Sequence, residues 1–475
     1  MGAVSFTSAR FARLLEGWSR AYGPLSIRLA DAIREHIRSG QLPAGARLPS
    51  ERDVAKSLGI ARTTVSAVFD ALRLEGLLVS RTGVGTFVTA AGRHATARGD
   101  DRLGSFAHEE NHARFDLRSA ALPAVPLVRE MLALQYSDEF ADVLKTHGYI
   151  PSGLGILRAA IADYYQAVGL ATHPNQILVT SGAQQAIRIV AHTLVERGDA
   201  VILEEPTYRG AIEVMRSAGA RLTGVPSDVQ GISSDALADC VRRQKPALVV
   251  LQSTVHNPTG SVLPEQTRVA IAELSARAKV TIVDHLVCMD ALIDGTIPRP
   301  LAAYGGHVLT IGSASKAFWG GLRVGWIRGD PDLITHFTAV KSAEDLGTSV
   351  PAQLTTARLL YRIDEARAYR RATLGAAREL VVRSLADRLP DWRPLPPAGG
   401  ASMWIGLPNG FSSTTLAERA GRAGVDLLPG TTFSSENRLD GWLRVAFAGS
   451  AEAVEAGIHR LSEVWQAIRD GSSAR

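Results

Sequence analysis

The sequence predicts an α/β protein with a small N-terminal domain and a large C-terminal domain. Its 475 residues exceed what one small core accommodates. Residues 22–90 show three helical patterns and then a β-hairpin, whereas residues 115–470 alternate β-like runs with helical patterns. That alternation favours a largely parallel sheet, ending in a small α+β subdomain. Residues 91–114 are polar, charged and poor in apolar side chains, so we expect a linker.

Helices are expected at about 25–39, 51–58 and 62–75. In the third, Val65, Val68, Phe69 and Leu72 recur at helical spacing and form one buried stripe. A hairpin follows in LLVSRTGVGTFV, around Gly83 and Gly85. Two short helices and a hairpin in this order form a winged helix-turn-helix pattern, typical of DNA-binding proteins.

Charge supports that interpretation. Residues 1–99 carry 14 Lys and Arg against 7 Asp and Glu, or +7, while the whole chain is only +5. A local basic excess suits a nucleic-acid reader, although a solvated surface would explain the charge alone. The third helix would enter the major groove, and phosphate contacts would come from flanking arginines and the wing. The candidate DNA-binding residues are Arg47, Arg52, Arg62, Thr63, Thr64, Arg81 and Gly85.

The strongest motif of the large domain is Ser313-Ala314-Ser315-Lys316, followed by Gly321-Leu322-Arg323-Val324-Gly325. A lysine directly after a strand suits a cofactor that carries an aldehyde and a phosphate. Lys316 would be catalytic and form a Schiff base, while Ser313 and Arg323 would hold the phosphate. The SxxK pattern alone is weak evidence, because serine hydrolases also use it and a single lysine is commonly a surface residue.

Other stretches strengthen the case for pyridoxal 5′-phosphate (PLP). Gly182, Ala183 and Gln184 open a helix after the strand ILVT, where backbone N–H groups bind phosphate. Asp284 ends a strand and would pair with the pyridine nitrogen. The remaining candidates are Asn257 for the ring oxygen, Tyr208 for the ring face and Arg444 for an effector or substrate carboxylate. Singly, each has a structural explanation such as a turn, a cap or an ion pair.

Two family resemblances follow from these motifs. LPSER, TTV and GTFV within residues 43–88 resemble the GntR-type DNA-binding domain, although Ala61 stands where that family often has a capping Ser. The cofactor motifs, in this order over about 350 residues, resemble fold-type I PLP aminotransferases. That resemblance implies a homodimer in which Tyr149 reaches the phosphate of the neighbouring subunit.

One departure affects the expected chemistry. The family usually has Tyr three residues after the pyridine-binding Asp, where Val287 stands here. Asn257 would then be the main partner of the ring oxygen, and efficient transamination becomes doubtful. His285 is not expected to substitute, because alternate residues of a strand point to opposite faces.

The two domains in this order resemble the MocR group of bacterial regulators. The resemblance implies a PLP-bound homodimer that binds an operator in double-stranded DNA and responds to PLP, an amino acid or a related amine. A PLP-sensing repressor without a second effector stays open. The main alternative is an active aminotransferase that carries a DNA-binding appendage, with half-transamination as a residual activity.

Composition narrows the remaining classes. The chain is 46% hydrophobic and 21% charged, and no apolar run reaches the length of a membrane span. Cys240 and Cys288 are its only cysteines, too few for a zinc site or a disulfide framework. We therefore expect a cytoplasmic protein without a metal or a membrane partner.

Overall fold

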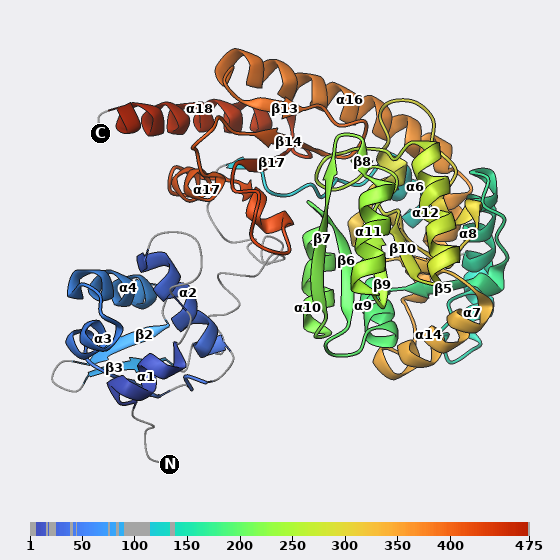
Figure 1. The fold of residues 1–475 in the computed structure, drawn as a ribbon. Helices are drawn as coiled ribbons and strands as arrows, with labels where there is room; N and C mark the ends of the chain where they lie inside the picture. The colour runs from blue at the N-terminus through green and yellow to red at the C-terminus, as the bar shows by residue number, and fades with distance from the viewer. Residues whose placement is uncertain are drawn as a thin grey trace. The chain divides into compact units, whose positions relative to one another are not determined.

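A computed structural model describes residues 6–15, 18, 25–38, 41–43, 45–74, 77–81, 85–89, 115–133 and 138–473. Internal contacts divide the chain into two units, Met1–Gly104 and Ser105–Arg475, coloured from blue to red along the chain in Figure 1. The expected linker at 91–114 lies outside the described residues.

The smaller unit combines helices with a three-stranded antiparallel sheet of order β1-β3-β2. Its described elements are α1 (Ser8–Leu14), α2 (Leu25–Arg38), β1 (Arg47–Leu48), α3 (Glu51–Leu58), α4 (Arg62–Leu74), β2 (Leu78–Arg81) and β3 (Gly85–Val88). The three predicted helices and the hairpin are confirmed, whereas α1 and β1 were not predicted from the sequence.

Local chemistry explains these elements. Ser50 caps α3, because its Oγ accepts the backbone N–H of Asp53 at 3.2 Å and donates to the Asp53 carboxylate at 2.7 Å. Gly59 ends the helix at φ 67°, in the left-handed region that favours glycine. The predicted stripe of α4 is buried, with at most 1% of Val65, Val68, Phe69 and Leu72 exposed.

The larger unit is built on a sheet of order β5-β12-β11-β10-β9-β6-β7-β8. Its central pairs are parallel, as predicted, but β12 runs antiparallel to both β5 and β11. The strands are β5 (Ile177–Thr180), β6 (Ala200–Glu205), β7 (Arg221–Asp228), β8 (Gly231–Ile232), β9 (Leu248–Leu251), β10 (Thr281–His285), β11 (Val308–Ser313) and β12 (Gly325–Arg328).

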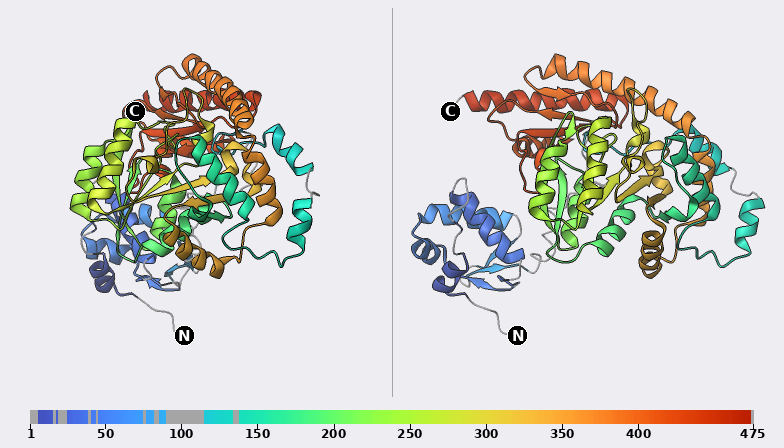
Figure 2. Two further views of the ribbon diagram at one scale, coloured as in Figure 1. Left: turned by 90° about the vertical axis from the view of Figure 1, so that its right-hand side faces the viewer. Right: turned by 45° about the vertical axis from the view of Figure 1, so that its right-hand side comes forward.

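Helices cover both faces of this sheet (Figures 1 and 2). Side chains of α11 and α12 pack on one face, and those of α9, α10 and α14 pack on the other. The helices are α6 (Pro126–Ala133), α7 (Asp138–Leu144), α8 (Gly155–Ala167), α9 (Ala183–Leu194), α10 (Arg209–Ser217), α11 (Ser234–Gln244), α12 (Glu265–Ala278), α13 (Ala314–Ala317), α14 (Pro331–Glu344) and α15 (Val350–Leu360).

The C-terminal subdomain is α+β, as predicted. Its antiparallel sheet has the order β13-β14-β17-β16, and β15 pairs with β4 from the start of the unit. The elements are β4 (Phe115–Asp116), α16 (Ile363–Arg388), β13 (Arg393–Leu395), β14 (Ser402–Gly406), α17 (Ser413–Arg422), β15 (Val425–Asp426), β16 (Leu428–Pro429), β17 (Trp442–Ala446) and α18 (Ala451–Ser473).

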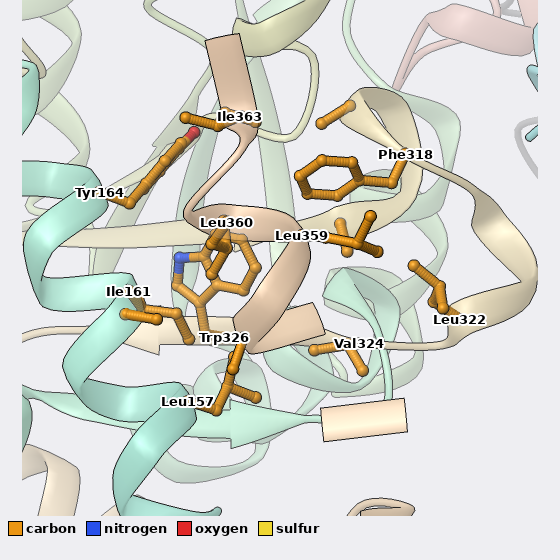
Figure 3. Packing of buried hydrophobic residues seen from close by; sticks show 14 of the residues in the cluster. Leu157, Ile161, Tyr164, Phe318, Leu322, Val324, Trp326, Leu359, Leu360 and Ile363 are labelled. Carbon is orange, nitrogen blue, oxygen red and sulfur yellow. The ribbon is translucent and has the colours of Figure 1, made fainter. Parts of the chain in front are cut away.

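One apolar cluster supports the segment that follows Lys316. Phe318, Leu322 and Val324 pack with Trp326 of β12 and with helices α8 and α15, as Figure 3 shows. The buried Trp326 donates its Nε1–H to the hydroxyl of Tyr165 at 2.8 Å. This close packing holds the segment after Lys316 in a fixed position. Within the described residues, every helix is too short or too polar to cross a bilayer.

Candidate functional sites

Lys316 lies on the short helix α13, directly after β11. Its Nζ donates to the carbonyl of Ala120 at 2.8 Å. Burial lowers the pKa of the amine, and the charges of Arg444 and Arg370 lower it further, whereas Cys288 raises it. A lysine with a lowered pKa is more often unprotonated at neutral pH and hence nucleophilic.

The start of α9 forms a cradle with Arg323. Gly182 precedes the helix at φ 89°, and a Cβ there would lie 2.6 Å from an Nη atom of Arg323. The guanidinium donates to the carbonyl of Ser181 at 2.9 Å. Ser313 accepts from the N–H of Ser315 and donates to the carbonyl of Val324. A helix N-terminus beside a guanidinium suits an anion.

Asp284 is fully buried near the end of β10. Its carboxylate accepts hydrogen bonds from the N–H and Oγ of Ser253, at 3.0 and 2.8 Å. Burial raises the pKa of Asp284, and the nearby charge of Arg268 opposes that shift. Arg268 is also buried and bonds the Oγ of Ser253 at 2.9 Å. A cation behind the carboxylate helps Asp284 stay ionised.

Asn257 and Arg444 contact each other across the two subdomains of the larger unit. Nη1 of Arg444, on β17, donates to Oδ1 of Asn257 at 3.0 Å, and Nη2 donates to the carbonyl of Arg118. Only 4% of Arg444 is exposed. Burial, together with the charge of Arg209, lowers the pKa of Arg444 to about 9. Among the described residues, the hydrogen bonds of its guanidinium go to neutral oxygens, so an anion entering here would be attracted.

Tyr208 precedes α10, and its hydroxyl donates to Oε1 of Gln184 at 3.2 Å. Its ring stacks on that of His285, with centroids 5.4 Å apart and planes at 24°. His285 and Asp284 point to opposite faces of β10, as the alternation of strand residues predicts. Tyr208 lies on the same face as His285. His285 is therefore next to a predicted site residue, a position that the sequence argument did not foresee.

Tyr149 and Val287 lie in contrasting environments. Tyr149 is 62% exposed, whereas Val287 packs against the apolar cluster beneath α9 and α10. Val287 is partly buried and has no hydroxyl, so it would give no hydrogen bond to a ring oxygen.

Arg370 on α16 is a site residue that the sequence did not reveal. It is 2% exposed and donates to the carbonyls of Lys316, Ala317, Phe318 and Pro123 at 2.7–3.2 Å. It thereby holds the turn that carries Lys316. Its partners are backbone atoms more than 50 positions away, which leave no sequence motif.

In the smaller unit, α4 presents Arg62 and Thr63 to solvent, with Thr64 half-buried. Arg47 and Arg52 are also exposed; the side chain of Arg81 and all of Gly83 lie outside the described residues. Gly85 has φ 131°, and a Cβ there would lie 2.8 Å from Nε of Arg47, so the glycine makes room for that arginine.

Comparisons with known proteins agree with both units. Residues 25–88 match the family of bacterial regulatory proteins of the gntR type, and residues 125–461 match aminotransferase class I and II. An uncharacterized HTH-type transcriptional regulator of Bacillus subtilis, YdfD, is 28% identical over 90% of this chain and 94% of its own length. The probable rhizopine catabolism regulatory protein MocR of Rhizobium meliloti is 31% identical over 67% and 68%.

Among solved structures, the α-aminoadipate aminotransferase LysN of Thermus thermophilus is 25% identical, with a TM-score of 0.69 over 78% of this chain and 97% of its own. No group of three or more potential metal ligands occurs within the described residues. The order of the two matched regions settles the family: the chain belongs to aminotransferase class I and II, carries a GntR-type DNA-binding domain and is a MocR-type transcriptional regulator.

Proposed function

We propose that this regulator binds PLP in its larger unit, senses a small amine or amino acid there, and binds operator DNA as a homodimer. The observation that carries the proposal is that Lys316 and Asn257 line one cavity and Arg444 bonds Asn257, in a chain whose residues 25–88 match the GntR-type regulatory proteins. In this proposal, residues 22–90 bind the DNA, and residues 115–470 bind the cofactor and the effector.

The residues present fit PLP. Gly182 leaves a cradle that a Cβ would fill, and Arg323 with the first N–H groups of α9 would hold the phosphate, helped by Ser313. Asp284 would hold the pyridine nitrogen, Asn257 the ring oxygen and Tyr208 the ring face. When bound, PLP supplies an aldehyde that reacts with primary amines. Lys316 is the amine of this chain that would hold it.

The exposed side of α4 supports DNA reading. Arg62, Thr63 and Thr64 at its N-terminal end would meet base edges, while Arg47, Arg52 and Arg81 would meet phosphates. Binding should weaken steeply with salt, because each neutralised phosphate releases counterions.

A homodimer is supported by exposed apolar side chains on the larger unit. Tyr149, Leu346 and Tyr361 are 62%, 49% and 62% exposed, and such residues commonly mark interfaces. Tyr149 would bond the phosphate of the partner's cofactor. Two readers in one dimer would fit half-sites about 34 Å apart or a multiple of that distance.

Sensing requires that the effector favour one arrangement of the readers over another. The carboxylate of an amino acid would pair with Arg444, and its amine would meet the cofactor near Lys316. An active aminotransferase is the second candidate, since most of the required side chains are present. Val287 argues against efficient turnover, because one hydrogen bond to the cofactor is missing.

Visible spectroscopy and DNA binding test the proposal together. Wild-type protein should turn yellow with PLP, and Lys316→Ala should lose that absorbance but remain a folded dimer. Arg62→Ala should weaken operator binding at least tenfold, whereas Lys56→Ala, an exposed control on α3, should have a smaller effect. A colourless wild type would refute the cofactor assignment, and steady keto-acid formation would favour the enzyme.

A further inference from the structure

A small, partly open cavity lies beside Lys316 in the larger unit. It is lined by residues from five places in the chain: Ala120 and Leu122, the loop after β9, the segment after β10, Lys316 on α13, and residues 399–402. Lys316 and Asn257 line one part of it. From its walls we infer that the effector is an amino acid with a short, uncharged, apolar side chain. This inference rests on the proposed function and specifies its ligand class.

The polar part of the cavity suits the amino-acid backbone. Nζ of Lys316 marks where an amine meets the cofactor, and Asn257 lines the same cavity. Arg444 contacts Asn257 at 3.0 Å, and its Nε has no hydrogen-bond partner among the described residues. A buried guanidinium with neutral partners and one unused N–H is a strong attractant for a carboxylate.

Apart from Lys316, Asn257, His256 and Cys288, the lining is largely apolar. It consists of alkyl groups and glycine backbone, contributed by Ala120, Leu122, Val255, Ala291, Ala401 and the glycines at 260, 399 and 400, with Ser402 as a small polar exception. Such a wall favours methyl and methylene groups by burial.

The two further titratable groups of the lining are neutral near pH 7. Burial lowers the pKa of His256 to about 4 and raises the pKa of the Cys288 thiol. Neither can form an ion pair with an effector side chain. A distal carboxylate or ammonium would therefore lose its hydration without gaining an opposite charge.

The expected binding affinities differ clearly between amino acids with apolar side chains and those with charged side chains. Each methylene buried against such a wall should tighten binding about fourfold until the cavity is full. An unpaired distal charge should weaken binding by about 100-fold or more relative to an alkyl chain of similar size. Valine and norvaline should therefore bind more tightly than alanine, and all three more tightly than aspartate, glutamate or lysine.

The test uses full-length, PLP-loaded protein. Alanine, 2-aminobutyrate, norvaline, aspartate, glutamate and lysine are titrated separately, with the visible spectrum of the bound cofactor as the readout. The expected order is norvaline, 2-aminobutyrate, alanine, then the charged amino acids. Tighter binding of any charged amino acid overturns this inference alone. A yellow protein that responds to none of these amines overturns amine sensing itself, and this inference with it.

Adjacent alanines provide a matched pair of variants. Ala120 lines the cavity, whereas Ala121 is exposed and does not. Ala120→Leu should weaken the binding of norvaline at least tenfold and the binding of alanine less than threefold. Ala121→Leu should leave both affinities unchanged. The carbonyl of residue 120, which accepts from Lys316, is present in either variant. Equal losses for both amino acids in Ala120→Leu would show that the cavity does not hold the effector side chain.

Discussion

The pH dependence of the unfolding free energy tests whether His285 is buried and uncharged in the folded protein. His285 is 7% exposed, and neither ring nitrogen reaches a hydrogen-bond partner on another described residue. Burial lowers its pKa to about 4, from 6.5 for an unperturbed histidine. As pH falls through 6.5, the unfolded chain binds a proton that the folded protein rejects, so the free energy of unfolding decreases.

The expected loss follows from that difference. The full interval between pH 6.5 and 4 corresponds to about 3 kcal/mol, of which about 2 kcal/mol should be lost between pH 7 and pH 5. His285→Phe retains a ring against Tyr208 but cannot titrate. Its unfolding free energy should therefore fall by about 2 kcal/mol less over this range than that of the wild type.

Urea unfolding of the cofactor-free full chain, followed by tryptophan fluorescence at pH 7 and pH 5, measures this difference. His336→Phe, at an exposed position on α14, is the control and should follow the wild type. The buried pair of His256 and Glu204, whose Nε2 and Oε2 lie 3.4 Å apart, is present in all three proteins and cancels. An identical pH dependence in His285→Phe would refute the claim that this ring is buried and neutral.

Three further substitutions test separate contacts. Gly182→Ala should weaken PLP binding at least tenfold in a fluorescence titration but affect pyridoxal, which lacks the phosphate, much less. Gly85→Ala should displace Arg47 and weaken operator binding in an anisotropy assay, with no change in the PLP spectrum. Arg370→Met leaves carbonyls around Lys316 without donors and should lower the unfolding free energy of the larger unit by about 3 kcal/mol. The control is Arg371→Met, at an exposed neighbouring position. It should lower the unfolding free energy by less than about 1 kcal/mol in the same urea assay.

Much of the fold could be predicted because its signals are local. The cap at Ser50, the stripe from Val65 to Leu72 and the alternation of strands with helices each depend on residues close together in the chain. The candidate cofactor residues were found for a related reason. Those at the ends of β9, β10 and β11 follow apolar runs, and parallel strands bring their carboxyl ends to one edge.

Contacts without such a signal were missed. Phe11 is the only buried residue of α1, so this helix has no apolar stripe that a sequence pattern could reveal. The GWIR run of β12 is equally compatible with either strand direction, because direction is set by pairing with β5 and β11. Arg268 and Arg370 bond mainly to backbone carbonyls and hydroxyls, which any sequence supplies.

The hydrogen bond between Arg444 and Asn257 links the two proposed ligands. Because Oδ1 of Asn257 accepts from Arg444, the Nδ2 group would be left to donate to the ring oxygen of a bound cofactor, where Val287 would offer no donor. An effector carboxylate that draws the guanidinium away would weaken the bond that orients this amide. Effector and cofactor would then be coupled energetically, and by linkage each would change the affinity of the other equally. Arg444→Leu should therefore shift the visible spectrum of bound PLP without any effector; an unchanged spectrum, with effector binding lost, would show that Arg444 serves the carboxylate alone.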